Sequence, residues 1–578
     1  MLYPQQNAHR YTSSLDGLWS FRVQRTEDDA STWPRGFTTE RLAAVPASFN
    51  ELFLDYDTTN LLGVVWYARS LQVPDALRDK RLVVRFGAIN YAATVYLNGE
   101  QIGAHETGYT PFEVSLNGHL RDDDNLLVVR VDTNLTPDTV PQGNLHTKAT
   151  AGQFTGNTPR VNFDFFPYGG IHRPVVLCAT EPDCLDTLWI DTDTDGTTGL
   201  VTVRGECLGA VDRATVRIVE TGASADADIA GNAFETRLSI PDVKLWGCLQ
   251  PNLYHVEVAL VRDGIRTDVY RRHFGVRTVR IEGDRVLLNG EPVTLRGFGK
   301  HEDFFVSGKG LNEAVNVRDM ELLKWIGANS FRTSHYPYAE EMLTLADKVG
   351  ILVISESPAV SIVTDLATER TLETHCRVLR EYMARDYNHP CVVMWSVANE
   401  CTTHVPSSRP YFEKVVATAR EMDAKRPITM AMCHWPDERC WDLLDVIGVN
   451  AYPGWYGGGA PLDQTQAYFR GFLDSVYEKV RKPIMITEIG GDAIAGFHSL
   501  PPVLWTEDYQ RDLLRANLEV IDEKAYIVGA HVWAFADFHT AQNDRRAYGN
   551  RKGVFTRDRT PKMAAYELRR MWRGDSRG

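Results

Sequence analysis

The chain of 578 residues lacks the motifs that mark several common classes of enzyme. It contains no HExxH motif, no EF-hand loop and no Cys/His quartet, which are familiar protein sites for zinc and calcium. It also contains no glycine-rich phosphate-binding or dinucleotide-binding loop and no GxSxG nucleophile motif. The sequence therefore predicts chemistry that uses neither a metal nor a cofactor.

Signs of a disulfide framework, a membrane span or a nucleic-acid partner are also missing. The nine cysteines form no CxxC pair, and this odd, unpatterned number predicts a reducing, cytoplasmic compartment. The N-terminus resembles no secretory signal, although a secreted protein whose signal had been removed would look the same. No run of about 18 apolar residues is present, so we expect no membrane span. The net charge of −14 argues against nucleic acid as a partner.

The first half of the chain is rich in strand-length apolar runs. Residues 82–86, 93–97 and 126–131 are such runs, and Asn98-Gly99 is a strong hairpin signal. This pattern predicts a jelly-roll β-sandwich over residues 1–180. A second set of runs, including residues 200–204 and 254–260, predicts an immunoglobulin-like β-sandwich over residues 181–278.

After about residue 280, apolar strand candidates alternate with amphipathic helices. Strands are expected at residues 293–297, 330–333, 351–355, 392–397, 428–432, 446–450, 484–487 and 530–535. Helical periodicity marks residues 313–326, 339–349, 372–386, 411–424 and 506–524. Residues 279–578 are therefore predicted to form a C-terminal (β/α)₈ TIM barrel.

Two of the expected barrel strands end in a glutamate. Residues 391–400 read CVVMWSVANE and end in Glu400, and residues 483–488 read PIMITE and end in Glu488. Functional residues of such barrels collect at the carboxyl ends of the strands, and the fourth and seventh strands lie nearly opposite each other. The sequence therefore predicts the facing carboxylates that glycoside hydrolysis uses. A separation of about 5–5.5 Å would give retention of configuration, and roughly 6.5–9.5 Å inversion.

Further polar residues follow the expected strands, and some of them are expected to be structural. They are Lys300, His301, Glu302, Asp303, Ser334, His335, Tyr336, Glu356, Asn399, His434, Asn450, Tyr452 and Asp537. Residues 545–562 stand out from the acidic chain, with seven Lys or Arg residues and one acidic residue, Asp558. This basic stretch is either a solvated loop or a part of the predicted site.

Over essentially its whole length the chain resembles glycoside hydrolase family 2, and within it the β-glucuronidases. The resemblance is carried by residues 15–21 (LDGLWSF), 162–173 (NFDFFPYGGIHR) and 326–341 (IGANSFRTSHYPYAEE). It implies a retaining, exo-acting hydrolase that releases glucuronic acid and an aglycone from β-D-glucuronides.

The family's catalytic signatures match residues of this chain. Its Asn-Glu pair at the fourth barrel strand implies Glu400 as acid/base, and its Thr-Glu pair at the seventh implies Glu488 as the nucleophile of a covalent glycosyl-enzyme intermediate. The resemblance also implies that Asn399 binds the sugar 2-hydroxyl, that Tyr452 supports the nucleophile, and that Asp164 binds another sugar hydroxyl.

The sugar itself is indicated by a second motif. Glucuronidases of the family carry an Asn-x-Lys motif that binds the C6 carboxylate of glucuronic acid, and Asn550 and Lys552 match it. Hydrogen bonds of this kind are strengthened by the charge of the lysine. Arg546, Trp533 and Tyr456 match further residues around the same sugar.

Alternative functions stay open from the sequence. A β-galacturonidase would differ only at the C4 hydroxyl of its substrate. A β-galactosidase or β-mannosidase of the same family would leave the lysine unpaired, at a cost of about 1–3 kcal/mol or more. A carbohydrate-binding pseudoenzyme would have lost Glu400 or Glu488, and both are present. The resemblance also leads us to expect a homo-oligomer, either a tetramer or a dimer.

Two regions depart from the relatives. Ala451 and Pro453 stand where relatives often carry bulkier or basic residues, so we expect a different local shape of the pocket. The stretch between Ala359 and Leu372 is short, whereas some gut bacterial glucuronidases have a long loop there that closes over small aglycones. We therefore expect a more open entrance that accepts larger aglycones.

Overall fold

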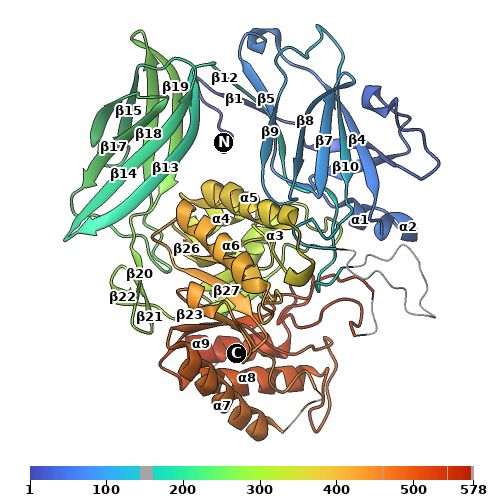
Figure 1. Ribbon diagram of the computed structural model, residues 1–578, viewed down its shortest axis with the longest axis vertical. Coiled ribbons are helices and arrows are strands. Elements are labelled where there is room, and N and C mark those ends of the chain that lie inside the picture. The colour runs from blue at the N-terminus through green and yellow to red at the C-terminus, as the bar shows by residue number, and fades with distance from the viewer. Residues whose placement is uncertain (144–160, 458, 460, 543–544, 575–578) are drawn as a thin grey trace.

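Two β-sandwiches and one closed barrel make up the part of the chain that the structure describes. The structure is a computed structural model, and it describes residues 1–143, 161–457, 459, 461–542 and 545–574. Both sandwiches lie on the same side of the barrel, and the helices that end the chain lie on its far side (Figure 1). The predicted fold class, with a jelly-roll sandwich, an immunoglobulin-like sandwich and a TIM barrel, is confirmed.

The first sandwich packs two antiparallel sheets against each other. One sheet has the strand order β1-β12-β5-β9 and the other the order β3-β2-β4-β10-β7-β8. Alternate residues of each strand point inward, and Trp19, Phe21 and Val84 are among the buried residues of the shared core. The strands are β1 (Tyr11–Ser14), β2 (Gly17–Val23), β3 (Arg41–Val45), β4 (Val64–Leu71), β5 (Arg81–Phe86), β7 (Ala92–Leu97), β8 (Glu100–Glu106), β9 (Phe112–Ser115), β10 (Asn125–Asp132) and β12 (Val175–Thr180). A two-stranded ribbon, β6 (Ile89–Asn90) and β11 (Gly170–Ile171), and the short helices α1 (Phe49–Leu52) and α2 (Tyr56–Thr59) lie beside them.

The hairpin between β7 and β8 forms where the sequence predicts it. Asn98 and Gly99 have φ values of 55° and 93°, so both adopt the left-handed conformation that a tight two-residue hairpin turn requires. Asparagine and glycine tolerate this conformation better than other residues do. The local sequence therefore sets the register of these two strands.

The second sandwich is smaller and follows directly along the chain. Its sheets have the orders β13-β14-β17 and β16-β15-β18-β19. The strands are β13 (Cys184–Asp195), β14 (Thr198–Leu208), β15 (Arg213–Ile218), β16 (Ser224–Asp228), β17 (Ala233–Ile240), β18 (Tyr254–Arg262) and β19 (Ile265–Phe274). A three-stranded sheet of β20 (Val279–Glu282), β21 (Arg285–Leu288) and β22 (Glu291–Pro292) then leads into the barrel, where Val286 and Leu288 join the barrel core.

Eight parallel strands close the barrel in chain order, from β23 to β30. They are β23 (Leu295–Lys300), β24 (Ser330–Thr333), β25 (Leu352–Glu356), β26 (Val392–Asn399), β27 (Ile428–Met432), β28 (Ile447–Asn450), β29 (Ile484–Ile489) and β30 (Ile527–Trp533). Each lies within three residues of a strand expected from the sequence. The strands are almost entirely buried, as the apolar sequences of most of them predict.

Helices cover the outside of the barrel. They are α3 (Glu313–Ile326), α4 (Glu340–Val349), α5 (Glu369–Asp386), α6 (Ser408–Met422), α7 (Leu462–Val480), α8 (Glu507–Asp522) and α9 (Met563–Arg573). The bounds of α3 agree with the sequence prediction because both ends are signalled: the Asn312 side chain accepts a hydrogen bond from the Val315 amide, and Gly327 ends the helix at φ 89°. Helices α7 and α9 are not among the helices predicted from the sequence. No helix among the described residues is both long and apolar enough to span a membrane.

Candidate active site

A cavity of about 790 Å³ opens at the carboxyl ends of the barrel strands. Strand ends, barrel loops and a segment of the first sandwich around Asp164 all line it. The site residues expected from the sequence that line it are Asp164, Asn399, Glu400, Tyr452, Tyr456, Glu488, Trp533 and Arg546. Asn550 and Lys552 do not line the cavity. They contact Asp164 and Asp492, respectively, at the same end of the barrel.

Glu400 follows the last residue of β26 and is held there in an unusual backbone conformation. Its φ is 49°, in the left-handed region that residues other than glycine rarely adopt. Its amide donates a hydrogen bond to the Ala431 carbonyl at 2.9 Å. Its carboxylate accepts a hydrogen bond of 2.9 Å from Nδ2 of Asn450, which also contacts the side chain of Asn399 at 3.1 Å. The side-chain amide of Asn450, the last residue of β28, thus holds Asn399 and Glu400 in place.

Glu488 lies in β29 and has stronger partners. One guanidinium nitrogen of Arg332 lies 2.5 Å from its Oε1. The Tyr452 hydroxyl donates a hydrogen bond to its other oxygen. Nε2 of His335 lies 3.8 Å from Oε1. A carboxylate that accepts hydrogen bonds from a cation and a phenol is stabilised in its ionised form.

The two glutamates differ in the groups that stabilise their ionised forms. Burial raises the pKa of both, and it raises the pKa of Glu488 to about 8. Part of the rise at Glu488 comes from the negative charge of Glu400, and that part vanishes once Glu400 is protonated. Arg332 and Tyr452 favour the anion at Glu488, whereas Glu400 accepts its hydrogen bond from the neutral amide of Asn450. The hydrogen bonds of Glu488 therefore stabilise its anion more than the single amide contact stabilises that of Glu400, whereas burial and the charge of Glu400 act on Glu488 in the opposite direction.

Arg332 and Glu356 contact the site, and the sequence predicted no role for either of them. Nη1 of Arg332 lies 2.7 Å from both carboxylate oxygens of Glu356, and both side chains are fully buried. Although burial raises the pKa of Glu356, the guanidinium and His335 hold it below its usual value. Glu356 thus neutralises part of the arginine charge and orients the guanidinium toward Glu488. Arg332 lies in β24, and its contact across the barrel has no signal in the sequence.

His335 and Trp533 form one wall of the cavity. Their rings are stacked, with centroids 4.8 Å apart and planes inclined by 24°. Nδ1 of His335 lies 2.9 Å from Glu356. Burial lowers the pKa of His335 to about 4, so the ring is neutral near pH 7.

A segment of the first sandwich contacts the basic stretch at the same cavity. Nε and Nη2 of Arg546 lie 3.1 and 2.5 Å from the carboxylate of Asp164. Nδ2 of Asn550 donates to the same carboxylate at 2.8 Å, and Arg546 also contacts the Tyr456 hydroxyl at 3.1 Å. The donors at this position therefore form a receptor for a carboxylate, and Asp164 occupies it.

Lys552 contacts an aspartate that the sequence analysis did not consider. Its ammonium lies 2.5 Å from Asp492, and both side chains are almost completely buried. Arg546 approaches the same carboxylate at 3.2 Å. The Lys552 ammonium also lies 5.0 Å from the ring centroid of Tyr456, a residue that lines the cavity. The two cations and the two aspartates, Asp164 and Asp492, balance in formal charge.

Several polar residues that follow the strands belong to ion pairs outside the cavity. Lys300 pairs with Asp319, Glu302 with Arg173, Asp303 with Arg557, and Asp537 with Lys562. His434 packs against His404, with ring centroids 4.1 Å apart. None of these five strand-end residues lines the cavity formed by the described residues. Their position at strand ends is therefore explained by the packing of loops on the barrel.

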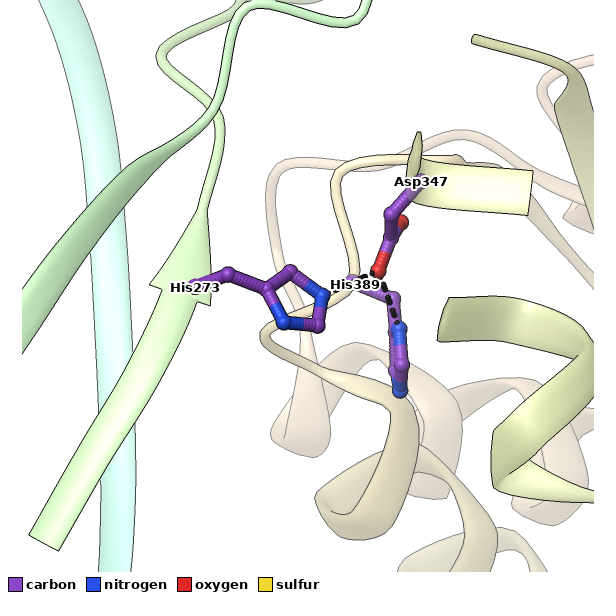
Figure 2. A group of neighbouring side chains, drawn as sticks. All are labelled: His273, Asp347 and His389. Atoms are coloured by element: carbon purple, nitrogen blue, oxygen red, sulfur yellow. Dashed lines mark hydrogen bonds and ion pairs between the residues drawn. The ribbon is translucent and has the colours of Figure 1, made fainter. Parts of the chain in front are cut away.

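A different cluster, at the opposite end of the barrel, is close enough in space to resemble a metal site. His273 of β19, Asp347 of α4 and His389 of the loop before β26 point toward one another (Figure 2). Oδ2 of Asp347 lies 2.8 Å from Nε2 of His273 and 2.5 Å from Nδ1 of His389. Its other oxygen accepts a hydrogen bond of 2.9 Å from the Cys391 amide.

The hydrogen bonds of this cluster explain it without a metal. A carboxylate only accepts hydrogen bonds, so both ring nitrogens that face Asp347 carry hydrogen. The remaining nitrogen of His389 lies 2.8 Å from a guanidinium nitrogen of Arg272 and accepts from it. If a metal replaced the proton on His389 Nδ1, the proton would move to Nε2 and oppose the N–H of Arg272. We interpret the cluster as a junction that joins the second sandwich to the base of the barrel.

Comparison with protein families assigns all three parts of the chain. Residues 12–182 match the sugar binding domain of glycosyl hydrolases family 2, and residues 279–574 match the TIM barrel domain of the same family. Residues 185–277, between them, also match a family model of glycosyl hydrolases family 2.

Individual relatives are similar over the full length. A beta-glucuronidase of Paenibacillus borealis is 39% identical over 588 residues, which cover 99% of this chain and 98% of the relative. A beta-glucuronidase of Canis lupus familiaris is 37% identical, over 99% of this chain and 92% of the relative. Among solved structures, a beta-glucuronidase of Ruminococcus gnavus in complex with D-glucuronic acid has a TM-score of 0.93 and 36% identity, covering 99% of each chain.

Proposed function

The chain belongs to glycoside hydrolase family 2, and we propose that it is a retaining, exo-acting β-glucuronidase. The observation that carries this proposal is a single cavity that joins a carboxyl pair to a receptor for a carboxylate. Glu400 and Glu488 supply the chemistry of glycoside hydrolysis. Arg546, Asn550 and Lys552 supply the recognition of a uronic acid.

In the first step, Glu488 is the nucleophile and Glu400 is the acid. A carboxylate oxygen of Glu488 attacks the anomeric carbon, and the bond from that carbon to the aglycone oxygen breaks. The proton on Glu400 passes to the departing oxygen, which leaves as an alcohol or phenol. The arginine and tyrosine that contact Glu488 keep it ionised before the attack, and the amide of Asn450 orients the acid.

In the second step, Glu400 acts as a base. It takes a proton from water, and the oxygen of that water attacks the anomeric carbon as the ester bond to Glu488 breaks. Glucuronic acid leaves with its original anomeric configuration, and Glu400 again holds the proton. Asn399, beside the acid/base, is placed to hold the 2-hydroxyl of the sugar through both steps.

The sugar carboxylate exchanges with Asp164 at its receptor. In the structure the carboxylate of Asp164 accepts hydrogen bonds from Arg546 and Asn550. We propose that the C6 carboxylate of the substrate takes this place and that Asp164 then accepts a hydrogen bond from a sugar hydroxyl. Lys552, held by Asp492, adds positive charge next to the incoming carboxylate. A neutral sugar would leave this receptor without an anion to bind.

Three matched substrates test this function: the nitrophenyl glycosides of β-D-glucuronic acid, β-D-galacturonic acid and β-D-galactose. We expect the glucuronide to have the highest kcat/KM. A preference for the galacturonide would change the assignment at C4, and activity on the galactoside alone would contradict the proposal. Proton NMR of the first-formed product would show the β-anomer if the mechanism is retaining.

We further propose that the protein assembles as a homo-oligomer. The proposal rests on the family resemblance. Light scattering of the purified protein tests it, because a molar mass equal to that of one chain at micromolar concentration would contradict it.

A further inference from the structure

The cavity extends beyond the catalytic pair onto one face of α7. Residues that line it from this helix are Gln464, Thr465, Tyr468, Phe469 and Phe472, whose spacing places them on one side of a helix. Tyr468 is 66% exposed although it is a large aromatic residue. Its ring stacks with that of Phe472, with centroids 6.3 Å apart and planes inclined by 17°. An exposed, pre-arranged ring on a cavity wall is a surface that a ligand can cover.

Trp435, in the loop after β27, continues this surface. The Lys479 ammonium lies 5.9 Å from the Trp435 ring centroid and donates hydrogen bonds to the carbonyls of Pro436 and Glu438. Because Lys479 belongs to α7, these bonds hold the helix and the loop together. Trp435, Tyr468 and Phe472 together are called the aromatic shelf below.

The aromatic shelf lies on the side of the aglycone. Trp435 follows β27, and Tyr468 and Phe472 belong to the helix that follows β28. These two strands come directly after β26, the strand that precedes Glu400. The sugar-binding candidates lie further along the barrel: Trp533 is the last residue of β30, and Arg546 lies in the loop after that strand. The acid Glu400 must face the aglycone oxygen, so the part of the cavity next to it beyond the sugar holds the aglycone.

Charge is confined to the sugar side of the cavity. The carboxylates and the guanidinium that line it belong to Asp164, Glu400, Glu488 and Arg546. Among the described residues, the wall formed by the shelf and its neighbours from α7 contains no Lys, Arg, Asp or Glu. The cation nearest the shelf, Lys479, does not line the cavity, and its ammonium donates to the carbonyls of Pro436 and Glu438. An anionic aglycone, such as a sulfated or uronic acid-containing sugar chain, would therefore meet no cation on this wall of the cavity, whereas a flat apolar aglycone would bury the exposed rings.

We propose that the aromatic shelf is the aglycone subsite and that it selects flat, uncharged aglycones of several fused rings over anionic sugar chains. This inference rests on the proposed glucuronidase function. Tyr468, Trp435 and Phe472 are its specificity-determining residues. The cavity volume of about 790 Å³ is in the range of pockets that bind drug-sized molecules, so a monosaccharide leaves room for such an aglycone.

Two substrates separate this inference from the function on which it rests. β-D-Glucuronyl fluoride has no ring on its leaving group, so its turnover reports the sugar site and the catalytic pair alone. A steroid 3-glucuronide presents four fused rings to the shelf. The ratio of kcat/KM for the steroid glucuronide to kcat/KM for the fluoride measures the contribution of the subsite.

In Tyr468→Ala we expect this ratio to fall roughly five- to tenfold, the size of effect that one aromatic contact gives. Tyr468→Phe keeps the ring and should keep the ratio. Tyr566→Ala removes a partly exposed tyrosine from another barrel helix, α9, and is the matched control, so its ratio should equal that of the wild type.

An unchanged ratio in Tyr468→Ala, together with turnover of the fluoride, would overturn the shelf and leave the glucuronidase function standing. Absence of fluoride turnover in the wild type would instead contradict the function. A glucuronide whose aglycone is an anionic disaccharide provides the second test. If the wild type preferred it to the steroid glucuronide, the proposed selection would be wrong. Gln464→Lys adds a cation beside the shelf and should raise kcat/KM for the anionic substrate several-fold.

Discussion

Two buried carboxylate clusters lie at opposite ends of the same barrel and differ in how fully their hydrogen bonds are used. At the base, Asp347 accepts from two histidines and a backbone amide, and its side chain is fully buried. At the mouth, Glu488 has a guanidinium and a phenol as partners, and it lines a cavity together with Glu400. Both carboxylate oxygens of Asp347 are occupied by donors, so the base cluster is suited to stabilising the fold. The mouth cluster keeps a reactive oxygen beside a space for substrate.

The comparison teaches that residue type alone does not distinguish the two clusters. A group of two histidines and one aspartate resembles a catalytic or metal site in composition, yet Arg272 completes its hydrogen bonds. The mouth cluster contains residues of equally ordinary types. What distinguishes it is the pair of carboxyls, Glu400 and Glu488, that line one cavity together.

The largest expected effect is the loss of the nucleophile. Glu488→Ala should lower kcat on an aryl glucuronide by a factor on the order of 10⁴ or more, because no covalent intermediate forms. Sodium azide should restore part of the rate in Glu488→Ala and give an α-glucuronyl azide. In Glu400→Ala, azide should instead give the β-azide, since it then attacks the covalent intermediate. The two products identified by NMR decide the assignment, and the reverse pattern would exchange the two roles.

The carboxylate receptor comes next in size. Lys552→Ala should lower kcat/KM for a glucuronide about 100-fold relative to that for the matching neutral glucoside, since a charge-assisted hydrogen bond is lost. The ratio of the two substrates is the measured quantity, because a general loss of folded protein would lower both rates equally. An unchanged ratio would show that Lys552 does not recognise the carboxylate. Asp492→Asn, which keeps the lysine charge, should change the ratio less.

A smaller effect on catalysis, but a clear one on stability, is expected at the base. In Asp347→Asn one amide N–H would face a histidine N–H, so we expect a loss of about 2–4 kcal/mol in the free energy of unfolding. Thermal denaturation measures it, with the exposed Asp437→Asn as control. Below the melting transition, kcat should stay near that of the wild type because the cluster is remote from the cavity. A large loss of kcat without a loss of stability would contradict the structural role.

The smallest change is a shift in pH dependence. Because burial raises the pKa of Glu400, kcat/KM should fall on the alkaline side at a pH above the ordinary pKa of a glutamic acid. The sign follows from its role: the acid must hold its proton, so activity is present below this pKa and is lost as the pH rises through it. Glu400→Gln, assayed with a dinitrophenyl glucuronide whose leaving group needs no proton, should lose this alkaline limb. Persistence of the limb would assign it to another group.

Most barrel strands could be predicted because they are short, mainly apolar runs, a pattern that burial on both faces imposes, whereas β23 (LRGFGK) and β24 (SFRT) are less apolar. The missed helix α7 shows where such reasoning fails. Phe469, Leu473 and Val476 have helical spacing and face the core, but Tyr468 and Phe472 add apolar residues toward the cavity. The helix therefore has two apolar faces, and the amphipathic pattern is blurred where it lines the site.

The catalytic pair was predictable because both glutamates end apolar runs, whereas their supporting residues were not. Arg332 reaches Glu488 across the barrel, from β24 to β29, strands that are not neighbours. Asp492 reaches Lys552 from a loop separated by 60 positions in the chain. Such contacts arise only when the barrel closes, and neither periodicity nor local spacing encodes them. Family resemblance supplied the role of Lys552, and the structure added the aspartate that holds it.

The left-handed backbone of Glu400 has a consequence for how such a protein can evolve. A residue with a side chain is strained at this φ, by about 1 kcal/mol or more, whereas glycine is not. Either glutamate codon becomes a glycine codon by one base change. That change would remove the proposed acid/base and the hydrogen bond from Asn450, and the relief of the backbone would offset part of the stability lost with that bond. A duplicated gene released from selection for turnover thus has a short path to a sugar-binding protein that no longer hydrolyses its ligand.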